Sequence, residues 1–294
     1  MADRKELEML TGFGRTLGGG MLFAVQPDEW AEQPGDHRTF VFRPGANSVD
    51  LIEVVTRPIH ESWMSTNGTG YCPTNNGQLL IYADGAWTTE VICGRAEEFG
   101  AMTGFGAPLP ANDELIVGGS ASIFARRNRR WKEHNVPDDV GELYGLHGLT
   151  PSEVYLCSDA GLFLWDGKEF ESVDGPEDDE LSNVLVVSPT EIIGVGDGVH
   201  VWTDKKGWRQ LKSPCDDVAG GLCRLGRDIF IPSLEGIMQL KDGKLKKVAT
   251  FSTNPLVAVG DNIFGAIVGG GICRYDGTTW TRIAVPKLAS GEKR

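Results

Sequence analysis

The chain has 294 residues, of which 41 are acidic and 28 are basic, so its formal net charge is −13. This excess of acid argues against nucleic acid as a direct partner, because phosphate binding draws on clustered lysine and arginine, and it leaves basic proteins open as partners. No stretch approaches the roughly 20 apolar residues that cross a bilayer, and the 39 glycines indicate many short strands and tight turns.

The N-terminal part predicts a first, divergent unit of β structure. The first residues are charged and lack the apolar core of an export signal, so we expect a cytoplasmic protein. Two apolar runs, Met21–Val25 and Thr39–Phe42, flank an acidic insertion that carries Trp30, and runs of this length are typical of strands. The sequence TGFG at Thr11–Gly14 recurs at Thr103–Gly106, in the place of a first strand of a later unit.

One frame recurs from residue 77 onward. Each copy runs through an apolar strand, a small turn, an alternating strand that ends in an aromatic residue, and a last strand that begins with a large apolar anchor. The aligned anchors are Trp87, Trp131, Phe170, Trp208, Leu245 and Trp280, and they are 44, 39, 38, 37 and 35 residues apart. With the N-terminal unit, this spacing is typical of four-stranded propeller blades, whose period is about 40–50 residues.

We therefore predict an all-β fold, a seven-bladed β-propeller of four-stranded antiparallel blades, as a single domain over residues 1–294; six or eight blades remain as alternatives. Small residues suit the inner strands, where blades converge, and the aromatic anchors suit the outer strands. We expect tight hairpin turns at four Asp-Gly pairs, because glycine tolerates positive φ. They are Asp84-Gly85, Asp166-Gly167, Asp242-Gly243 and Asp276-Gly277.

The segment Gly271–Trp280, with the sequence GICRYDGTTW, shows the repeat in its clearest form. This frame resembles bacterial propeller repeats of the type x-G-apolar-x-x-[W/Y]-[D/N]-G-x-x-W, and the resemblance extends over about two thirds of the chain. It implies a propeller fold and says little about function. The Gly-His and Trp-Asp marks of WD40 repeats and the S-x-D-x-G-x-T-W box of sialidases are missing.

No motif for catalysis or metal binding stands out in the sequence. The five histidines lack metal-binding spacing, and there is no His-Glu-x-x-His, Gly-x-Ser-x-Gly or phosphate loop. His147 falls on an expected inner strand, where we predict a satisfied polar residue near the axis, and His200 is predicted to pack within a blade. The six cysteines have no C-x-x-C pair and are expected to be reduced, structural thiols. We predict no catalytic residue, no metal and no cofactor.

The charges are sorted by position along the repeat. The links between blades and the middle hairpin of each blade should lie on one face of the disc, and the other hairpins on the opposite face. The predicted partner-binding residues on the first face are Asp28, Glu29, Trp30 and Glu32 in the insertion, and Glu97, Glu98, Asp138, Asp139, Glu177, Asp178, Asp179, Glu180, Asp216 and Asp217 in four consecutive links. The opposite face collects Arg126, Arg127, Arg129, Arg130, Lys205, Lys206, Lys241, Lys244, Lys246 and Lys247.

These patterns favour a non-enzymatic propeller that binds a basic protein on its acidic face. An acidic, stand-alone binder without a catalytic motif resembles the immunity proteins of bacterial toxin systems, and this resemblance implies a cytoplasmic inhibitor of a basic, nuclease-like toxin. Two alternatives remain. One is a propeller enzyme, a lyase or hydrolase, that acts at the central channel with His147 and nearby carboxylates. The other is a scaffold whose basic run Arg126–Arg130 binds an acidic partner or RNA.

Overall fold

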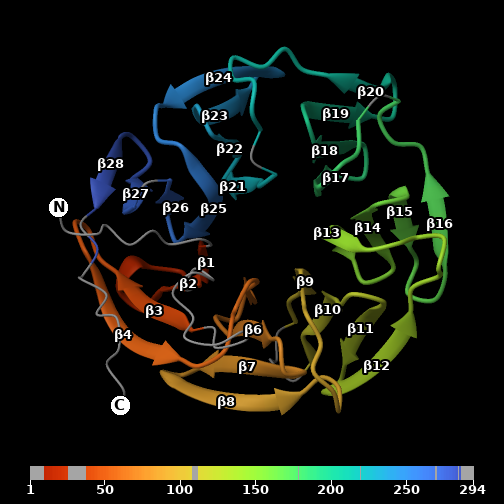
Figure 1. The fold of residues 1–294 in the computed structure, drawn as a ribbon, viewed down its shortest axis with the longest axis horizontal. Helices are drawn as coiled ribbons and strands as arrows, with labels where there is room; N and C mark the ends of the chain where they lie inside the picture. The colour runs from red at the N-terminus through yellow and green to blue at the C-terminus, as the bar shows by residue number, and fades with distance from the viewer. Residues whose placement is uncertain are drawn as a thin grey trace.

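Seven four-stranded antiparallel sheets form a ring around a central axis in the computed structural model (Figure 1). The structure describes residues 10–25, 38–107, 112–177, 179–218, 220–268, 270–283 and 285. Helical structure within these residues is confined to short 3₁₀ turns such as η1 (Leu17–Gly19). The predicted all-β propeller with seven four-stranded blades is confirmed.

Each blade uses four strands that are consecutive in the chain. Blade 1 contains β1 (Leu10–Phe13), β2 (Met21–Val25), β3 (Thr39–Pro44) and β4 (Val49–Val55), and blade 2 contains β5 (Trp63–Met64), β6 (Gly70–Thr74), β7 (Gln78–Ala83) and β8 (Ala86–Val91). Blade 3 contains β9 (Ala101–Phe105), β10 (Glu114–Gly118), β11 (Ser122–Arg127) and β12 (Arg130–Asn135), and blade 4 contains β13 (Leu143–Thr150), β14 (Glu153–Ser158), β15 (Gly161–Trp165) and β16 (Phe170–Val173). Blade 5 contains β17 (Asn183–Ser188), β18 (Glu191–Val195), β19 (Val199–Thr203) and β20 (Gly207–Gln210), and blade 6 contains β21 (Cys223–Leu225), β22 (Asp228–Ser233), β23 (Gly236–Lys241) and β24 (Lys244–Ala249). Blade 7 contains β25 (Thr253–Val259), β26 (Asn262–Ile267), β27 (Ile272–Tyr275) and β28 (Trp280–Ile283).

The large anchors lie on the fourth, outer strands, and they fill the space between neighbouring blades. Trp87 of blade 2 packs edge-on against Phe23 of blade 1, with ring centroids 6.2 Å apart, and Trp280 of blade 7 packs in the same way against Phe230 of blade 6, at 6.0 Å. Buried aromatic pairs of this kind contribute more than their area alone. The wedge between two blades is therefore closed at its wide end by the anchor of the later blade.

The inner strands need small residues because large rings from the adjacent blade lie on them. A Cβ atom on Gly104 of β9 would lie 2.5 Å from ring atoms of Trp63 on β5, and one on Gly70 would lie 2.3 Å from the ring of Phe13. Both TGFG segments fall on or next to first strands, β1 and β9, as expected.

The four Asp-Gly pairs form two kinds of turn. Asp84 and Asp242 have positive φ, as do the glycines after them, so these pairs are two-residue turns with left-handed backbone. Asp166 and Asp276 instead begin four-residue loops in which the Asp Oδ1 accepts hydrogen bonds from the backbone N–H groups of the next turn residues. All four pairs lie in hairpins and the glycine of each has positive φ, as expected; an Asx turn shapes the loops at Asp166 and Asp276.

The ring closes by packing, because blade 1 and blade 7 are each complete in themselves. Leu22, Phe40 and Phe42 of blade 1 share one buried apolar cluster with Val259 and Phe264 of blade 7. The backbone N–H of Gly260 also donates to the carbonyl of Gly14 over 2.6 Å. Loss of either blade would expose this cluster to water, so closure depends on both ends of the chain.

The six cysteines are free thiols, and five of them are buried. Burial raises the pKa of Cys157, Cys223 and Cys273 to about 12, so these thiols stay protonated at neutral pH. Within the residues that the structure describes, no helix has the length and apolar character needed to cross a membrane.

Candidate functional site

The described parts of the links between blades lie on one face of the ring, together with the middle hairpins of blades 2 to 7. This follows from the antiparallel order, since four strands return the chain to the side on which the blade began. We call this side the link face and the other side the opposite face. The four acidic segments do lie in links, at 92–100, 136–142, 174–182 and 211–222.

Seven of the predicted partner-binding residues are exposed on the link face: Glu98, Asp138, Asp139, Glu177, Glu180, Asp216 and Asp217. Asp28, Glu29, Trp30, Glu32 and Asp178 lie outside the described residues. The remaining two, Glu97 and Asp179, are not presented to solvent, and the expectation that they contact a partner is corrected by their internal contacts.

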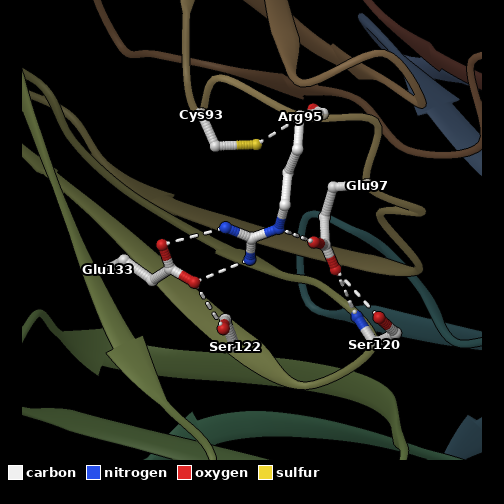
Figure 2. A network of polar contacts seen from close by, with 6 residues as sticks. All are labelled: Cys93, Arg95, Glu97, Ser120, Ser122 and Glu133. Carbon is white, nitrogen blue, oxygen red and sulfur yellow. Dashed lines mark hydrogen bonds and ion pairs between the residues drawn. The ribbon is translucent and has the colours of Figure 1, made fainter.

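Glu97 is buried, with 8% of its surface exposed, and its carboxylate binds the link 92–100 to blade 3. Its Oε1 accepts hydrogen bonds from both the backbone N–H and the hydroxyl of Ser120, each at 2.9 Å (Figure 2). Ser120 belongs to the middle hairpin of blade 3, where Gly119 leaves room for the carboxylate, since a Cβ there would lie 2.4 Å from Oε1. This carboxylate is part of the fold.

Arg95 neutralises negative charge at this link by pairing with two carboxylates. Its Nε donates to Glu97 over 3.1 Å, and its two terminal nitrogens donate to the carboxylate of Glu133 on β12 over 3.1 and 2.6 Å (Figure 2). Ser122 donates to the same carboxylate over 2.8 Å. The hydrogen bonds from Arg95 and Ser122 lower the pKa of Glu133.

Asp179 plays the equivalent part at the acidic link 174–182. Its side chain is 5% exposed, and its Oδ2 lies 2.6 Å from Nε2 of His200 on β19. Its two oxygens also accept hydrogen bonds from the backbone N–H groups of Asp197 and Gly198, in the middle hairpin of blade 5. His200 is buried within its blade, as predicted, and its partner is the carboxylate of the link.

Two exposed carboxylates of the link 174–182 line a groove between blades 4 and 5. The groove has a volume of about 780 Å³, and its walls include Glu177 and Glu180 from the link. Asp159 and Asp197 join them from the middle hairpins of blades 4 and 5, and both are exposed. The sequence analysis missed these two residues because, apart from the insertion in blade 1, it counted only links, although the same parity places middle hairpins on this face.

Tyr144 lies at the inner end of the groove, and the pKa of its hydroxyl reflects the negative charge around it. Its side chain is exposed, and its hydroxyl donates a hydrogen bond to the carboxylate of Asp159. This hydrogen bond, together with the negative charges of Asp159, Glu142 and Glu180, raises the pKa of Tyr144 to about 12. A cation entering the groove would meet several carboxylates in the same small space.

The groove continues into the central channel. Tyr144, Ser182 and Gly220 line both the groove and a channel cavity of about 1070 Å³, whose walls come from the inner strands of the ring. The channel is mixed in character: Thr11 and Ser62 share a hydrogen bond of 2.8 Å across blades 1 and 2, and Arg224 of blade 6 adds a positive charge. Both spaces open toward the link face, where β5, β13 and β17 begin.

Glu61 is the most perturbed carboxyl group in the channel. It precedes β5 on the link from blade 1, and burial raises its pKa to about 8. A carboxyl group with this pKa is largely protonated at neutral pH and can donate a hydrogen bond or a proton. Nothing in the sequence marks Glu61, because its burial results from the convergence of blades that are distant in the chain.

His147 of β13 has a structural position between blades 4 and 5. Its Nδ1 accepts a hydrogen bond from the backbone N–H of Val186 on β17 over 3.2 Å. Burial, with a smaller effect of the charge of Arg224, lowers the pKa of His147 to about 4. This agrees with the expectation of a satisfied polar residue near the axis. In the part of the chain that the structure describes, no group of His, Cys, Asp and Glu side chains is arranged to hold a metal ion.

One residue assigned to the basic face belongs to the interior. Arg126 is 3% exposed, and its guanidinium forms two hydrogen bonds of 2.8 and 2.9 Å with Glu90 of blade 2. It also donates to the carbonyl of Asp113 and lies over the ring of Tyr71. Arg126 therefore joins blades 2 and 3, whereas Arg127, Arg129 and Arg130 are exposed on the opposite face.

Comparison with known proteins shows the propeller fold and no closer relation. No family model and no curated protein matches the chain. The chain is similar to virginiamycin B lyase from Staphylococcus aureus, with a TM-score of 0.63 at 9% identity over 90% of this chain and 92% of that one. A catalytically inactive form of the lyase, with quinupristin, gives 0.62 at 11% identity over 76% and 82%. The extracellular domain of a hybrid two-component system from B. thetaiotaomicron gives 0.65 at 14% identity, over 92% of this chain and 38% of that one.

Proposed function

We propose that the protein binds a basic protein partner at the groove between blades 4 and 5, as a cytoplasmic inhibitor of a nuclease-like toxin. The observation that carries this proposal is the groove itself, in which Asp159, Glu177, Glu180 and Asp197 are exposed around one cavity. A lysine or arginine side chain of the partner would neutralise them. Opposite charge across an interface speeds association and selects the partner.

The remaining acidic links have a supporting role in this function. Glu98, Asp138, Asp139, Asp216 and Asp217 are exposed on the same face, so they extend the negative field beyond the groove. Such a field steers a cationic protein toward the disc and acts mainly on the association rate. The groove provides the specific contacts, and the surrounding links provide attraction. A nuclease fits this arrangement because the surface that binds its substrate must be positive.

The test compares two variants with the same change in charge. The groove variant carries Asp159→Asn, Glu177→Gln, Glu180→Gln and Asp197→Asn. The control variant carries Asp138→Asn, Asp139→Asn, Asp216→Asn and Asp217→Asn, which neutralise four charges of the same face outside the groove. Both are titrated with an oligo-arginine peptide and with a panel of basic nuclease domains, whose activity is measured in parallel.

We expect the groove variant to lose at least tenfold in affinity and the control variant to lose mainly association rate. Inhibition of one nuclease by the natural sequence, lost in the groove variant, would support the toxin inhibitor. Equal losses in both variants would mean that only the net charge matters, and the assignment of the groove would be wrong. Absence of nuclease inhibition together with peptide binding would remove the toxin role and leave a groove for cationic segments.

A second candidate function is an enzyme, a lyase or hydrolase, with its site in the central channel. The observation that favours it is Glu61, whose raised pKa suits a proton donor facing a cavity of ligand size. A screen with chromogenic ester, lactone and glycoside substrates tests it. Turnover that is lost in Glu61→Gln and kept in the groove variant would support the enzyme. Absence of turnover in the natural sequence, or turnover that is unchanged in Glu61→Gln, would count against it.

A further inference from the structure

Tyr144 is the one aromatic side chain that is exposed among the residues that the structure describes. It is 46% exposed, whereas every other described aromatic side chain is buried or half-buried. It lies on β13, the innermost strand of blade 4 (Figure 1), where the groove between blades 4 and 5 meets the central channel. Aromatic side chains are enriched where proteins bind one another, so this ring is a candidate contact for the partner.

A β-bulge places the side chain of Tyr144 in the groove. Leu143 pairs with Ser158 and Gly145 pairs with Cys157, so β13 has one residue more than β14 over this stretch. Tyr144 is the extra residue, and its neighbours Leu143 and Gly145 are both buried. Bulges are common beside binding sites, where they redirect a side chain. The ring of Tyr144 therefore lines the groove although the residues on either side of it belong to the interior.

Asp159 holds the ring of Tyr144 in position. Its carboxylate accepts one hydrogen bond from the hydroxyl of Tyr144 and a second, over 3.3 Å, from the backbone N–H of Glu142. Both hydrogen bonds lower the pKa of Asp159, so this carboxylate stays charged at neutral pH. A side chain that is already held loses little further freedom when a ligand packs against it.

The groups around this ring suit a guanidinium group better than an ammonium group. Glu180 lies close enough to Tyr144 for its charge to raise the pKa of the hydroxyl, and Glu177 and Asp197 line the same groove. A guanidinium group is flat, so it can stack on an aromatic ring while its N–H groups donate to carboxylates in its own plane. An ammonium group is a compact, strongly hydrated charge without a flat face.

We propose that Tyr144 makes the groove selective for arginine over lysine in the partner. This inference rests on the proposed function, because it names the side chain that the groove between blades 4 and 5 receives. The guanidinium group stacks on the ring of Tyr144, and its N–H groups donate to the exposed carboxylates of Glu177 and Glu180. Asp159 keeps its hydrogen bond with the hydroxyl and holds the ring in place.

Titration with two capped peptides of equal charge, hexa-arginine and hexa-lysine, tests this selectivity. We expect the natural sequence to bind hexa-arginine about fivefold more tightly than hexa-lysine. Tyr144→Leu removes the ring and leaves every charge in place. It should lower the affinity for hexa-arginine about threefold and change the affinity for hexa-lysine by less than about twofold. The ratio of the two affinities is compared, because long-range attraction affects both peptides alike.

Two further variants separate the ring from other effects. Tyr144→Phe keeps the ring and removes the hydroxyl, so it should keep the preference for arginine. Leu234→Ala is the matched control on the link face, because Leu234 is an exposed apolar residue in the middle hairpin of blade 6. This control should bind both peptides as the natural sequence does.

Each part of the proposal has an outcome that contradicts it. An unchanged ratio in Tyr144→Leu, or the same change in Leu234→Ala, would overturn the role of the ring. Loss of the preference in Tyr144→Phe would overturn the stacking contact. Equal affinities of the natural sequence for the two peptides would overturn the selectivity and leave the groove as a site for either cation. Binding of neither peptide would overturn the groove itself, and the selectivity with it.

Discussion

The junction between blades 2 and 3 and the junction between blades 4 and 5 begin from similar sequences and end as different structures. Both links carry several carboxylates, Glu97 and Glu98 in one and Glu177, Asp179 and Glu180 in the other. At the first junction an arginine of the link itself, Arg95, joins Glu97 to Glu133 across the blades. At the second, Asp179 is bound internally, and the exposed Glu177 and Glu180 line a groove.

Both junctions share one structural device, which accounts for part of the acidic character of the links. In each, one carboxylate accepts hydrogen bonds from backbone N–H groups of the middle hairpin in the blade that follows, Ser120 in one case and Asp197 and Gly198 in the other. One acid per link is thus structural at these two junctions. The second junction differs because it has further carboxylates that are not bound internally. We call them surplus carboxylates, and they are the ones that a partner can contact.

The largest effect should come from the buried arginine at the closed junction. Arg126→Met removes the cation that pairs with Glu90 and leaves a mostly buried carboxylate at the interface of blades 2 and 3, which keeps the hydrogen bond from Trp131. Breaking one side of such a pair costs about 3 kcal/mol, and urea unfolding measures it. Arg130→Met, at the exposed end of the same hairpin, is the control and should stay within about 0.5 kcal/mol. Adding Glu90→Gln should recover part of the loss, and no recovery would show that packing of the arginine stem is responsible.

Glu97→Gln should have the next largest effect at the closed junction. The amide keeps an acceptor for Ser120 and loses the ion pair with Arg95, so we expect a loss of about 1–2 kcal/mol in the free energy of unfolding. Glu98→Gln is the neighbouring control, since Glu98 is exposed. If the two variants lost the same stability, the distinction between structural and surplus carboxylates would fail.

The open junction should be more sensitive to acid than the closed one, through His147. The pKa of this imidazole in the folded protein is about 4, against about 6.5 in an unfolded chain. The unfolded state therefore binds the proton first, and stability is lost as the pH falls from about 6.5 to about 4. Solvent near the channel reduces the full effect, so we expect a loss of roughly 1–2 kcal/mol by pH 5.

Urea unfolding at pH 7.5 and pH 5 measures this loss, and His147→Asn keeps an acceptor near the position of Nδ1 while removing the titration. In that variant the contribution of His147 to the pH dependence should vanish. An unchanged pH dependence would assign the acid sensitivity to another group, such as His134, whose pKa is also lowered.

The fold could be predicted from the sequence because blades repeat locally, whereas the site depends on contacts between distant residues. The period of the anchors marks the blades, and the parity of antiparallel strands places the links on one face. Parity could also have found Asp159 and Asp197 in the middle hairpins. It could not show that Glu97 and Asp179 are bound internally, since their partners Ser120 and His200 are 23 and 21 residues away from them. The burial of Glu61 and Arg126 likewise arises only when the ring forms.

The smallest effect on stability should come from the surplus carboxylates of the open junction, and it is the one that ties the comparison to function. Glu177→Gln with Glu180→Gln removes two exposed charges that repel Asp159 and Asp197 across the groove. Exposed charges contribute little to folding, so the free energy of unfolding should change by less than about 0.5 kcal/mol, and relief of repulsion should make any change positive. Unfolding at low salt measures it, because screening hides the repulsion at high salt. A clear loss of stability would mean that these carboxylates have structural partners, and the groove would then resemble the closed junction.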